Sequence, residues 1–258
     1  MIFPLSSALP GRLVHVAETG STNADLLADP AAAHGDVLLT LSQTAGRGRL
    51  DRRWVARPGR TVAVSLVVER GELGVEALGW VPLLAGAAMR TAVADLLPGR
   101  EVGLKWPNDV QVGGAKVCGI LAELRPDASA VVVGAGVNLV TDADELPTPA
   151  STSLRLEGAT GDAEELADEV VSRWVADVLR SVAALAAAGG DAVASGLHAR
   201  VVRECTTLGR RVRVELPSGE VLAGEAVAVD ATGRLEVVEA SGARRTVASG
   251  DVTHVRYE

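Results

Sequence analysis

The pattern of the chain changes near Thr207, and this change constrains the fold more than any other feature. From Leu208 to Glu258 the sequence holds short segments rich in β-forming residues, at 211–216, 221–229, 234–239, 243–248 and 252–257. Turn-forming residues separate several of them, namely Pro217-Ser218-Gly219, Thr232-Gly233 and Ser241-Gly242. Short strands at this spacing are typical of a small barrel. We therefore predict a first domain over 1–206 and a β-rich domain over 207–258.

Strand and helix signals alternate along the first domain. Apolar or β-branched segments predict strands at 12–18, 37–41, 61–68, 102–106 and 130–139, and a hairpin formed by 110–112 and 116–124 around Gly113-Gly114. Helices are indicated after the N-cap residue Ser21, over 80–97, after the capping pair Asp162 and Glu165, and near 191–203; residues 141–160 have the composition of a loop. The fold class is therefore α+β, a mixed β-sheet flanked by helices.

Composition limits the kinds of protein that this chain can be. Hydrophobic residues make up 48% and charged residues 22%, which is enough to bury a core, but aromatic residues are only 2%, so Val, Leu and Ala must fill it. Cys118 and Cys205 have no second cysteine or histidine at metal-ligand spacing, so two buried thiols are expected. The apolar stretch Trp80–Met89 contains Pro82 and is too short to cross a bilayer. With no signal peptide evident, we expect a cytoplasmic location and no membrane partner.

Charge argues against a protein that coats nucleic acid. The net charge is −8, and no long basic run exists. Positive residues concentrate only at Arg47, Arg49, Arg52, Arg53, Arg57 and Arg60. A cluster of this size favours a small anionic ligand over a duplex.

The segment Ser42–Trp54 is the first that carries chemistry. Gly46 and Gly48 let the backbone approach a ligand, and the interleaved arginines supply forked, permanently charged donors for carboxylate or phosphate. Repulsion between these charges predicts a loop that is mobile when empty and ordered once an anion neutralises it. From charge alone, a solvated basic loop is the alternative.

Two further segments place polar groups near strand ends. In Gly103–Val110, Pro107 marks a bend after a strand, although a plain hairpin turn has the same pattern. In Gly114–Leu124, Lys116 stands at the head of an apolar strand, as a phosphate ligand or as a side chain that reaches out to solvent. Gly119 leaves room for a flat ligand. Neither G-x-x-x-x-G-K-[ST] nor a complete G-x-G-x-x-G is present, so generic motifs do not establish nucleotide binding.

Taken in order, five segments of the chain resemble the biotin–protein ligase family. They are Thr19-Gly20-Ser21-Thr22-Asn23, Gln43 with Gly46–Trp54, Lys105-Trp106-Pro107-Asn108-Asp109, Lys116-Val117-Cys118-Gly119-Ile120-Leu121 and Gly134-Ala135-Gly136-Val137-Asn138-Leu139. Each segment alone is a weak to moderate indication of the family, but five segments in the family's order are highly specific. The resemblance implies the catalytic fold of that family, which is like a class II aminoacyl-tRNA synthetase, followed by an SH3-like barrel.

The resemblance also implies a reaction. ATP and biotin would be the substrates, with Mg²⁺: biotin is activated as biotinoyl-AMP and then transferred to a lysine of a biotin carboxyl carrier protein. Both steps need negative charge to be stabilised, which suits a site built from arginine and lysine.

Site residues follow from the matching positions. The resemblance gives Lys116, Arg47 and Arg49 as catalytic residues; Ser21, Thr22, Asn23, Gln43, Arg47, Gly48, Arg49, Lys116 and Gly119 as biotin-binding; Arg49, Arg52, Trp54, Asn108 and Asn138 as ATP- or adenylate-binding; and Asp109 as a metal ligand.

Two alternative functions stay open. A lipoate–protein ligase shares the fold and the chemistry, and a non-catalytic biotin-binding module is the alternative from another class. Some members of the family carry an N-terminal helix-turn-helix domain; here the catalytic domain is expected to start within about the first dozen residues, so we expect no DNA binding. A monomer or a weak homodimer is expected.

Overall fold

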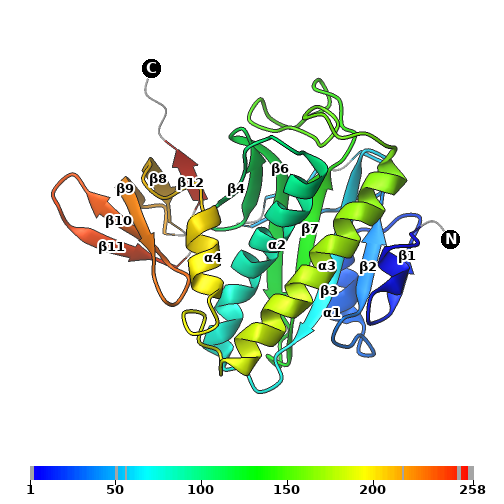
Figure 1. Cartoon of the computed structure of the whole chain (residues 1–258), viewed down its shortest axis with the longest axis horizontal. Coiled ribbons are helices and arrows are strands. Elements are labelled where there is room, and N and C mark those ends of the chain that lie inside the picture. Colours follow the sequence, from blue (N-terminus) through cyan, green and yellow to red (C-terminus); the bar gives the residue numbers. More distant parts are fainter. Residues whose placement is uncertain (1–2, 50–51, 56, 217, 249–250, 255–258) are drawn as a thin grey trace.

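The computed structural model describes residues 3–49, 52–55, 57–216, 218–248 and 251–254. Two β-sheets organise the chain, a seven-stranded sheet in the first domain and a five-stranded sheet in the second (Figure 1). The large sheet has the order β1 (Leu13–His15), β2 (Val37–Thr40), β3 (Thr61–Glu69), β7 (Ala130–Asn138), β6 (Ala115–Leu124), β5 (Asp109–Val112) and β4 (Val102–Lys105). Since β1 and β2 pair in parallel and the other neighbours are antiparallel, the predicted mixed sheet is confirmed.

The predicted hairpin forms between β5 and β6. Its turn residues Gly113 and Gly114 both have positive φ, 55° and 85°. Two positive φ values in succession are what a two-residue type I′ turn requires, and glycine adopts them without strain. This turn sets the pairing of Lys116 with Gln111, and an irregularity beyond it shifts the register so that Gly119 pairs with Asp109.

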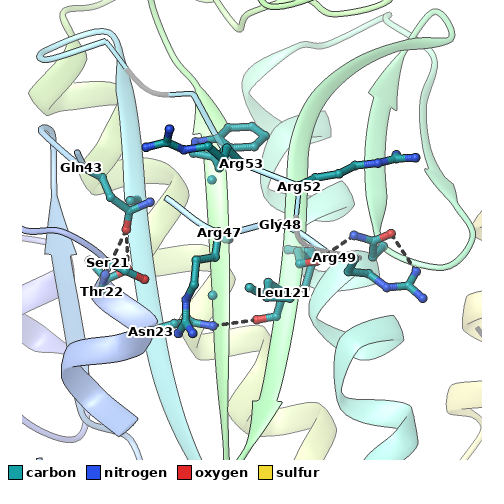
Figure 2. A pocket seen from close by; sticks show the side chains of 18 of the residues that line it. Ser21, Thr22, Asn23, Gln43, Arg47, Gly48, Arg49, Arg52, Arg53 and Leu121 are labelled. Atoms are coloured by element: carbon teal, nitrogen blue, oxygen red, sulfur yellow. Dashed lines mark hydrogen bonds between the residues drawn. The ribbon is translucent and has the colours of Figure 1, made fainter. Parts of the chain in front are cut away.

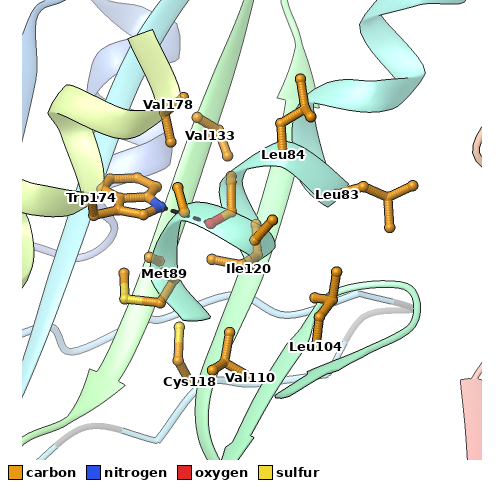
Figure 3. Packing of buried hydrophobic residues seen from close by; sticks show 14 of the residues in the cluster. Leu83, Leu84, Met89, Leu104, Val110, Cys118, Ile120, Val133, Trp174 and Val178 are labelled. Atoms are coloured by element: carbon orange, nitrogen blue, oxygen red, sulfur yellow. Dashed lines mark hydrogen bonds between the residues drawn. The ribbon is translucent and has the colours of Figure 1, made fainter. Parts of the chain in front are cut away.

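Two long helices, α2 (Val81–Leu96) and α3 (Ala163–Ala187), cover one face of the large sheet (Figure 1). The predicted capping box begins α3, because Asp162 accepts the backbone N–H of Glu165 while the Glu165 side chain accepts that of Asp162. Figure 3 shows the core between these layers, where Trp174 Nε1 donates to Ala85 O at 3.0 Å. Buried Val and Leu fill most of this core, as composition predicted.

The opposite face of the sheet is covered only in part. There α1 (Thr22–Ala28) packs Leu26 against Leu38, Val67 and Val132 in a second, smaller core. These strand residues alternate with those of the main core, as a pleated strand requires. Beyond α1, this face of β3, β7 and β6 is free for the site.

The helical segment before β4 is longer than expected. A 3₁₀ helix, η2 (Val75–Trp80), leads into α2, and Val75–Leu96 together are long and apolar enough to cross a membrane, contrary to the sequence estimate. However, 67% of the apolar window is buried inside the fold. It is a core helix that packs against the sheet and α3.

The helix predicted near 191–203 begins later than expected. Helix α4 spans Leu197–Glu204, and residues 191–196 form turns instead. The cause is local: Asp191 Oδ1 accepts the backbone N–H groups of Val193 and Ala194, and Gly196 adopts a φ of 77°. The Asp191 side chain starts one turn, and the positive φ of Gly196 interrupts it, so α4 begins only after this glycine.

The second domain is an antiparallel sheet. Its order is β11 (Arg244–Val247), β10 (Leu235–Glu239), β9 (Val221–Val229), β8 (Arg211–Glu215) and β12 (Asp251–His254). All five predicted β-rich segments therefore form strands, although the last prediction extended past residue 254, outside the described residues. Closure of this sheet into an SH3-like barrel stays a prediction.

Tryptophan side chains join the two domains. Trp106 Nε1 donates to Gly233 O at 3.0 Å, and Trp80 Nε1 donates to Ala231 O at 3.3 Å, so the β9–β10 turn is bonded to the first domain. Next to it, the linker pairs with the edge strand β4 through Thr206 N–H and Leu104 O at 2.8 Å. Thus β4, the hairpin and the second domain are held in fixed relation.

Candidate functional site

A cavity lies on the sheet face that α1 leaves open, beneath the glycine- and arginine-rich segment. Its volume is about 150 Å³. Figure 2 shows Gln43, Ser21 and Thr22 on one side of it and Arg49 and Arg52 on the other. The lining residues are Ser21, Thr22, Asn23, Gln43, Arg47, Gly48, Arg49, Arg52, Arg53, Trp54, Ala63, Val64, Asn108, Asp109, Lys116, Gly119, Ile120, Leu121, Gly134, Ala135 and Gly136.

Glycines form the floor of the cavity. Gly136 on β7 pairs with Gly119 on β6, and Gly134 lies two residues away on the same face of β7. A Cβ atom at Gly136 would lie 2.3 Å from Trp54 Cε2, and one at Gly134 would lie 2.2 Å from Asn23 Oδ1. The missing side chains therefore let an indole and an amide lie directly against the sheet.

The wall formed by α1 presents a hydrogen-bonded set of polar side chains. The Thr22 backbone N–H, at the start of the helix, donates to Gln43 Oε1 at 3.0 Å. Ser65, buried on β3, lies behind them with its Oγ 2.7 Å from Thr22 Oγ1 and 2.6 Å from Asn23 Oδ1. The predicted N-cap is confirmed, because Ser21 Oγ accepts the Ala24 N–H. This wall therefore presents hydrogen-bonding side chains to the cavity.

Backbone pairing shapes the glycine- and arginine-rich segment. Gly48 N–H donates to Arg52 O at 2.6 Å, and Trp54 N–H donates to Gly46 O at 3.0 Å, so the chain doubles back on itself over the cavity. Residues 50 and 51 lie outside the described residues. Arg49 Nη1 donates to Asn108 Oδ1 at 3.3 Å, which joins the segment to the bend after β4.

Lys116 and Asp109 form an ion pair inside the cavity. The Lys116 Nζ lies 2.6 Å from Asp109 Oδ1, and also 5.8 Å from the centroid of the Trp54 ring. A Cβ at Gly119 would lie 3.1 Å from the same Nζ, which places the ammonium directly above the glycine floor. The lysine therefore points into the site and not out to solvent.

The cavity is strongly positive. Among its described lining residues Arg47, Arg49, Arg52, Arg53 and Lys116 are cationic, and Asp109 is the one carboxylate. Such a surface attracts anions and stabilises negative charge that develops during a reaction. Cys118 is no part of it: the thiol is buried on the opposite face of β6, and burial raises its pKa, so it stays neutral.

The structure brings together nearly all of the residues predicted from the sequence. Every one of them lines this cavity except Asn138. Asn138 is buried at the end of β7, where its Nδ2 donates to Thr152 O at 2.9 Å. In this arrangement its side chain supports the 148–153 loop.

Sequence reasoning missed two supporting residues, Ser65 and Glu123. Both look like ordinary strand residues, and no motif marks them. Their relation to the site comes from register alone, since Ser65 pairs with Gly134, and Gly134 pairs with Leu121 two residues before Glu123. In the sequence, the glycines at positions 134 and 136 are the sign that one face of β7 lacks side chains there.

Comparison with known proteins agrees with this geometry. Residues 15–138 match the biotin/lipoate A/B protein ligase family, and residues 207–255 match the biotin protein ligase C-terminal domain. A biotin–[acetyl-CoA-carboxylase] ligase of Mycobacterium tuberculosis is 39% identical over 93% of this chain and 88% of its own length. The chain belongs to the biotin–protein ligase family. The relative of the same name from Paracoccus denitrificans is 36% identical over 63% of this chain and 72% of its own length.

Solved structures of the biotin–protein ligase family share the fold. The biotin protein ligase from Aquifex aeolicus in complex with biotin and ATP superposes with a TM-score of 0.75, at 23% identity, over 95% of this chain and 99% of its own. The apo structure of the same enzyme gives 0.74. The predicted fold class is therefore confirmed for this member of the biotin–protein ligase family.

Proposed function

We propose that this chain activates biotin with ATP and transfers it to a lysine of a biotin carboxyl carrier protein. The observation that carries the proposal is the convergence of Arg49 and Lys116, from separate segments, on one positive cavity with a glycine floor. Membership of the family supports the choice of biotin as the acid. The relatives' names point to acetyl-CoA carboxylase as the source of the carrier domain.

In the first step two anions must meet. A biotin carboxylate oxygen attacks the α-phosphorus of ATP, the bond to the β-phosphate oxygen breaks, and pyrophosphate leaves. Lys116 above Gly119 supplies a point charge where these groups would meet, and Arg49 supplies a planar fork suited to phosphate oxygens. Preorganised cations of this kind stabilise charge that grows in the transition state.

In the second step the ε-amine of the carrier lysine attacks the acyl carbon of biotinoyl-AMP. The bond from this carbon to the phosphate oxygen breaks, AMP leaves, and the amine loses its proton to solvent. Because the mixed anhydride also reacts with water, the segment 46–54 above the cavity would exclude water until the carrier arrives.

Each predicted residue receives a role in this scheme. Ser21, Thr22, Asn23 and Gln43 would bind the biotin ring, Gly48 would let the segment approach it, and Arg47 would close over it. Trp54 would stack on adenine, with Arg52 and Asn108 around the nucleotide, and Asn138 would act on the adenine end through the 148–153 loop that it supports. Trp54 Nε1 is buried and has no hydrogen-bond partner among the described residues, which favours a ligand acceptor near it.

Asp109 fits a role in holding Mg²⁺. No group of three or more His, Cys, Asp or Glu side chains gathers anywhere in the described part of the chain, so an all-protein metal cage is not formed there. Mg²⁺ is usually held by one or two carboxylates together with substrate phosphates, and Asp109 faces the cavity. When bound, Mg²⁺ would neutralise phosphate charge. Lys116 would then release Asp109 and pair with the negatively charged ligand instead.

Replacing Lys116 by alanine tests the assignment. Transfer of labelled biotin to a carrier domain should depend on ATP and fall by about 100- to 1,000-fold in the variant, the usual cost of losing one electrostatic stabiliser. Arg180→Ala, which removes an exposed arginine of α3, is the matched control and should keep wild-type activity. Unchanged adenylate formation in Lys116→Ala would remove that residue from the mechanism.

Two alternatives make different predictions. For a lipoate–protein ligase, calorimetry would show binding of lipoate and none of biotin. For a non-catalytic module, biotin would bind but no label would reach the carrier. We expect no nucleic-acid or membrane partner, a cytoplasmic location and a monomer or weak homodimer.

A further inference from the structure

We propose that Glu123 is a positioning residue that ties Arg47 down across one end of the cavity and so slows the escape of biotin. The inference deepens the proposed function and rests on it for the identity of the ligand. It concerns a carboxylate that does not line the cavity, so Glu123 acts through its neighbours and not by contact with substrate.

One oxygen of Glu123 holds two groups that line the site. Glu123 Oε2 accepts from Asn23 Nδ2 at 2.8 Å and from Arg47 Nη2 at 3.0 Å. Asn23 belongs to α1 and Arg47 to the glycine- and arginine-rich segment, so the carboxylate on β6 joins three parts of the molecule. Figure 2 shows the Arg47 side chain extending from the segment toward Asn23 and Leu121.

The hydrogen bonds of Asn23 fix the position of Glu123 Oε2. Asn23 is buried, and its Nδ2 also donates to Leu121 O at 3.2 Å. Its Oδ1 can only accept, and the buried Ser65 hydroxyl donates to it at 2.6 Å. The bare position at Gly134 leaves no other place for this amide, because its oxygen fills the space of the missing Cβ. One N–H of the amide is therefore directed at Leu121 O and the other at the Glu123 carboxylate.

The ion pair with Glu123 gives Arg47 a different role from that of a free cation waiting for an anionic ligand. Its guanidinium is paired with a carboxylate of the protein, so its charge is already compensated before a ligand anion enters. Near the same end of the cavity, Gln43 is held by the Thr22 N–H. Residues 43–47 are thus fastened at both ends, and the stem of Arg47 acts as a strap over the pocket wall formed by α1.

The strap is expected to be weak. The Arg47 side chain is 43% exposed and that of Glu123 25%, and partly exposed ion pairs change equilibria by up to about fivefold. Removing the carboxylate should therefore loosen the segment without unfolding the chain, and the effect should appear in how long biotin stays bound.

The first test uses the ligand-free protein and does not depend on biotin. Trypsin should cut after the arginines of the 47–53 segment about threefold faster in Glu123→Ala than in wild type, because cleavage follows the open population. Glu123→Gln, whose amide oxygen still accepts a hydrogen bond, should fall between them. Glu169→Gln, which removes the exposed ion pair with Arg173 on α3, is the matched control. Equal cleavage rates in all four proteins would overturn the strap.

The second test is a double-mutant cycle on biotin dissociation. Glu123→Ala should speed dissociation about three- to fivefold, with kcat at saturating biotin unchanged, and should have little further effect in an Arg47→Ala background. The same acceleration in both backgrounds would show that Glu123 acts through Asn23 alone and would overturn the proposal. A wild-type protein that bound no biotin would refute the proposed function, whereas the proteolysis result would still decide whether Glu123 holds the segment.

Discussion

Replacing Gly136 by alanine tests whether the floor of the cavity is built to seat Trp54. A Cβ at this position would lie 2.3 Å from Trp54 Cε2 and 2.6 Å from Nε1. Carbon atoms pack at about 3.5–4.0 Å, so the indole must retreat by more than about 1 Å. Strand β7 cannot move instead, because β3 and β6 are hydrogen-bonded to its two edges. The tryptophan must therefore leave the floor.

Gly136→Ala should weaken ligand binding more than it lowers the free energy of unfolding. Alanine gains about 0.5–1 kcal/mol over glycine inside a strand, and the overpacking costs about 1–3 kcal/mol, so the net loss of unfolding free energy stays below about 2.5 kcal/mol. Losing an aromatic stack on a nucleotide base costs about 1–3 kcal/mol, which is roughly 5- to 150-fold in affinity. We therefore expect the KM for ATP to rise at least about fivefold.

The assay is biotin transfer at saturating biotin with ATP varied, together with thermal melting. Gly74→Ala is the matched control, because its φ is −61° and a Cβ there meets nothing within 4 Å. The control should keep both the wild-type KM and the wild-type melting temperature. A folded Gly136→Ala protein with an unchanged KM for ATP would refute the argument that Trp54 on this floor supports the nucleotide.

Two further predictions concern titratable groups. Partial burial opposes ionisation of Asp230, but hydrogen bonds from Thr232 and from the Arg234 N–H outweigh it and lower its pKa below the ordinary 3.8. A carboxyl whose pKa is lowered in the folded state stabilises the protein at pH values above its ordinary pKa, so Asp230→Asn should unfold at a lower urea concentration than wild type near neutral pH. The difference should vanish as the pH falls through the lowered pKa. A constant difference across this range would contradict the prediction. Cys118 should resist alkylation in the native protein, because burial raises its pKa, and should react once unfolded; rapid labelling of folded protein, seen by mass spectrometry, would show that the thiol is accessible.

Local sequence signals predicted the elements of the fold better than their arrangement. Ser21, the Asp162–Glu165 pair and Gly113-Gly114 act on their nearest neighbours, so each could be interpreted without knowing the rest of the chain. The pairing of β3 with β7 joins residues far apart in sequence, and no local pattern specifies it. The late start of α4 has a local cause too, in Asp191 and Gly196, but only the structure shows that Gly196 adopts a positive φ.

The residues of the candidate site also divide into those that a local segment marks and those that only strand register reveals. Lys116, Arg49 and Gly119 stand in recognisable segments, and the structure places them around one cavity. Ser65 and Glu123 became visible only through register, because a serine inside an apolar strand and a glutamate near a strand end are common. The partner of Arg47 was likewise hidden, since nothing in the sequence distinguishes a carboxylate of the protein from one of the ligand.

The size of the cavity indicates which parts must move. Its volume of about 150 Å³ is below the roughly 300–1,000 Å³ of most ligand pockets, so we expect the cavity to widen when a nucleotide and an acid bind together. The floor lies on hydrogen-bonded central strands, so we expect the cavity to widen at Gly46–Arg49 and Arg52–Trp54 above it. A strap made from a partly exposed ion pair suits a segment that must open and close repeatedly. A fully buried Arg47–Glu123 pair would resist the opening that substrate entry requires, whereas loss of the pair would expose the reactive anhydride to water up to about fivefold more often.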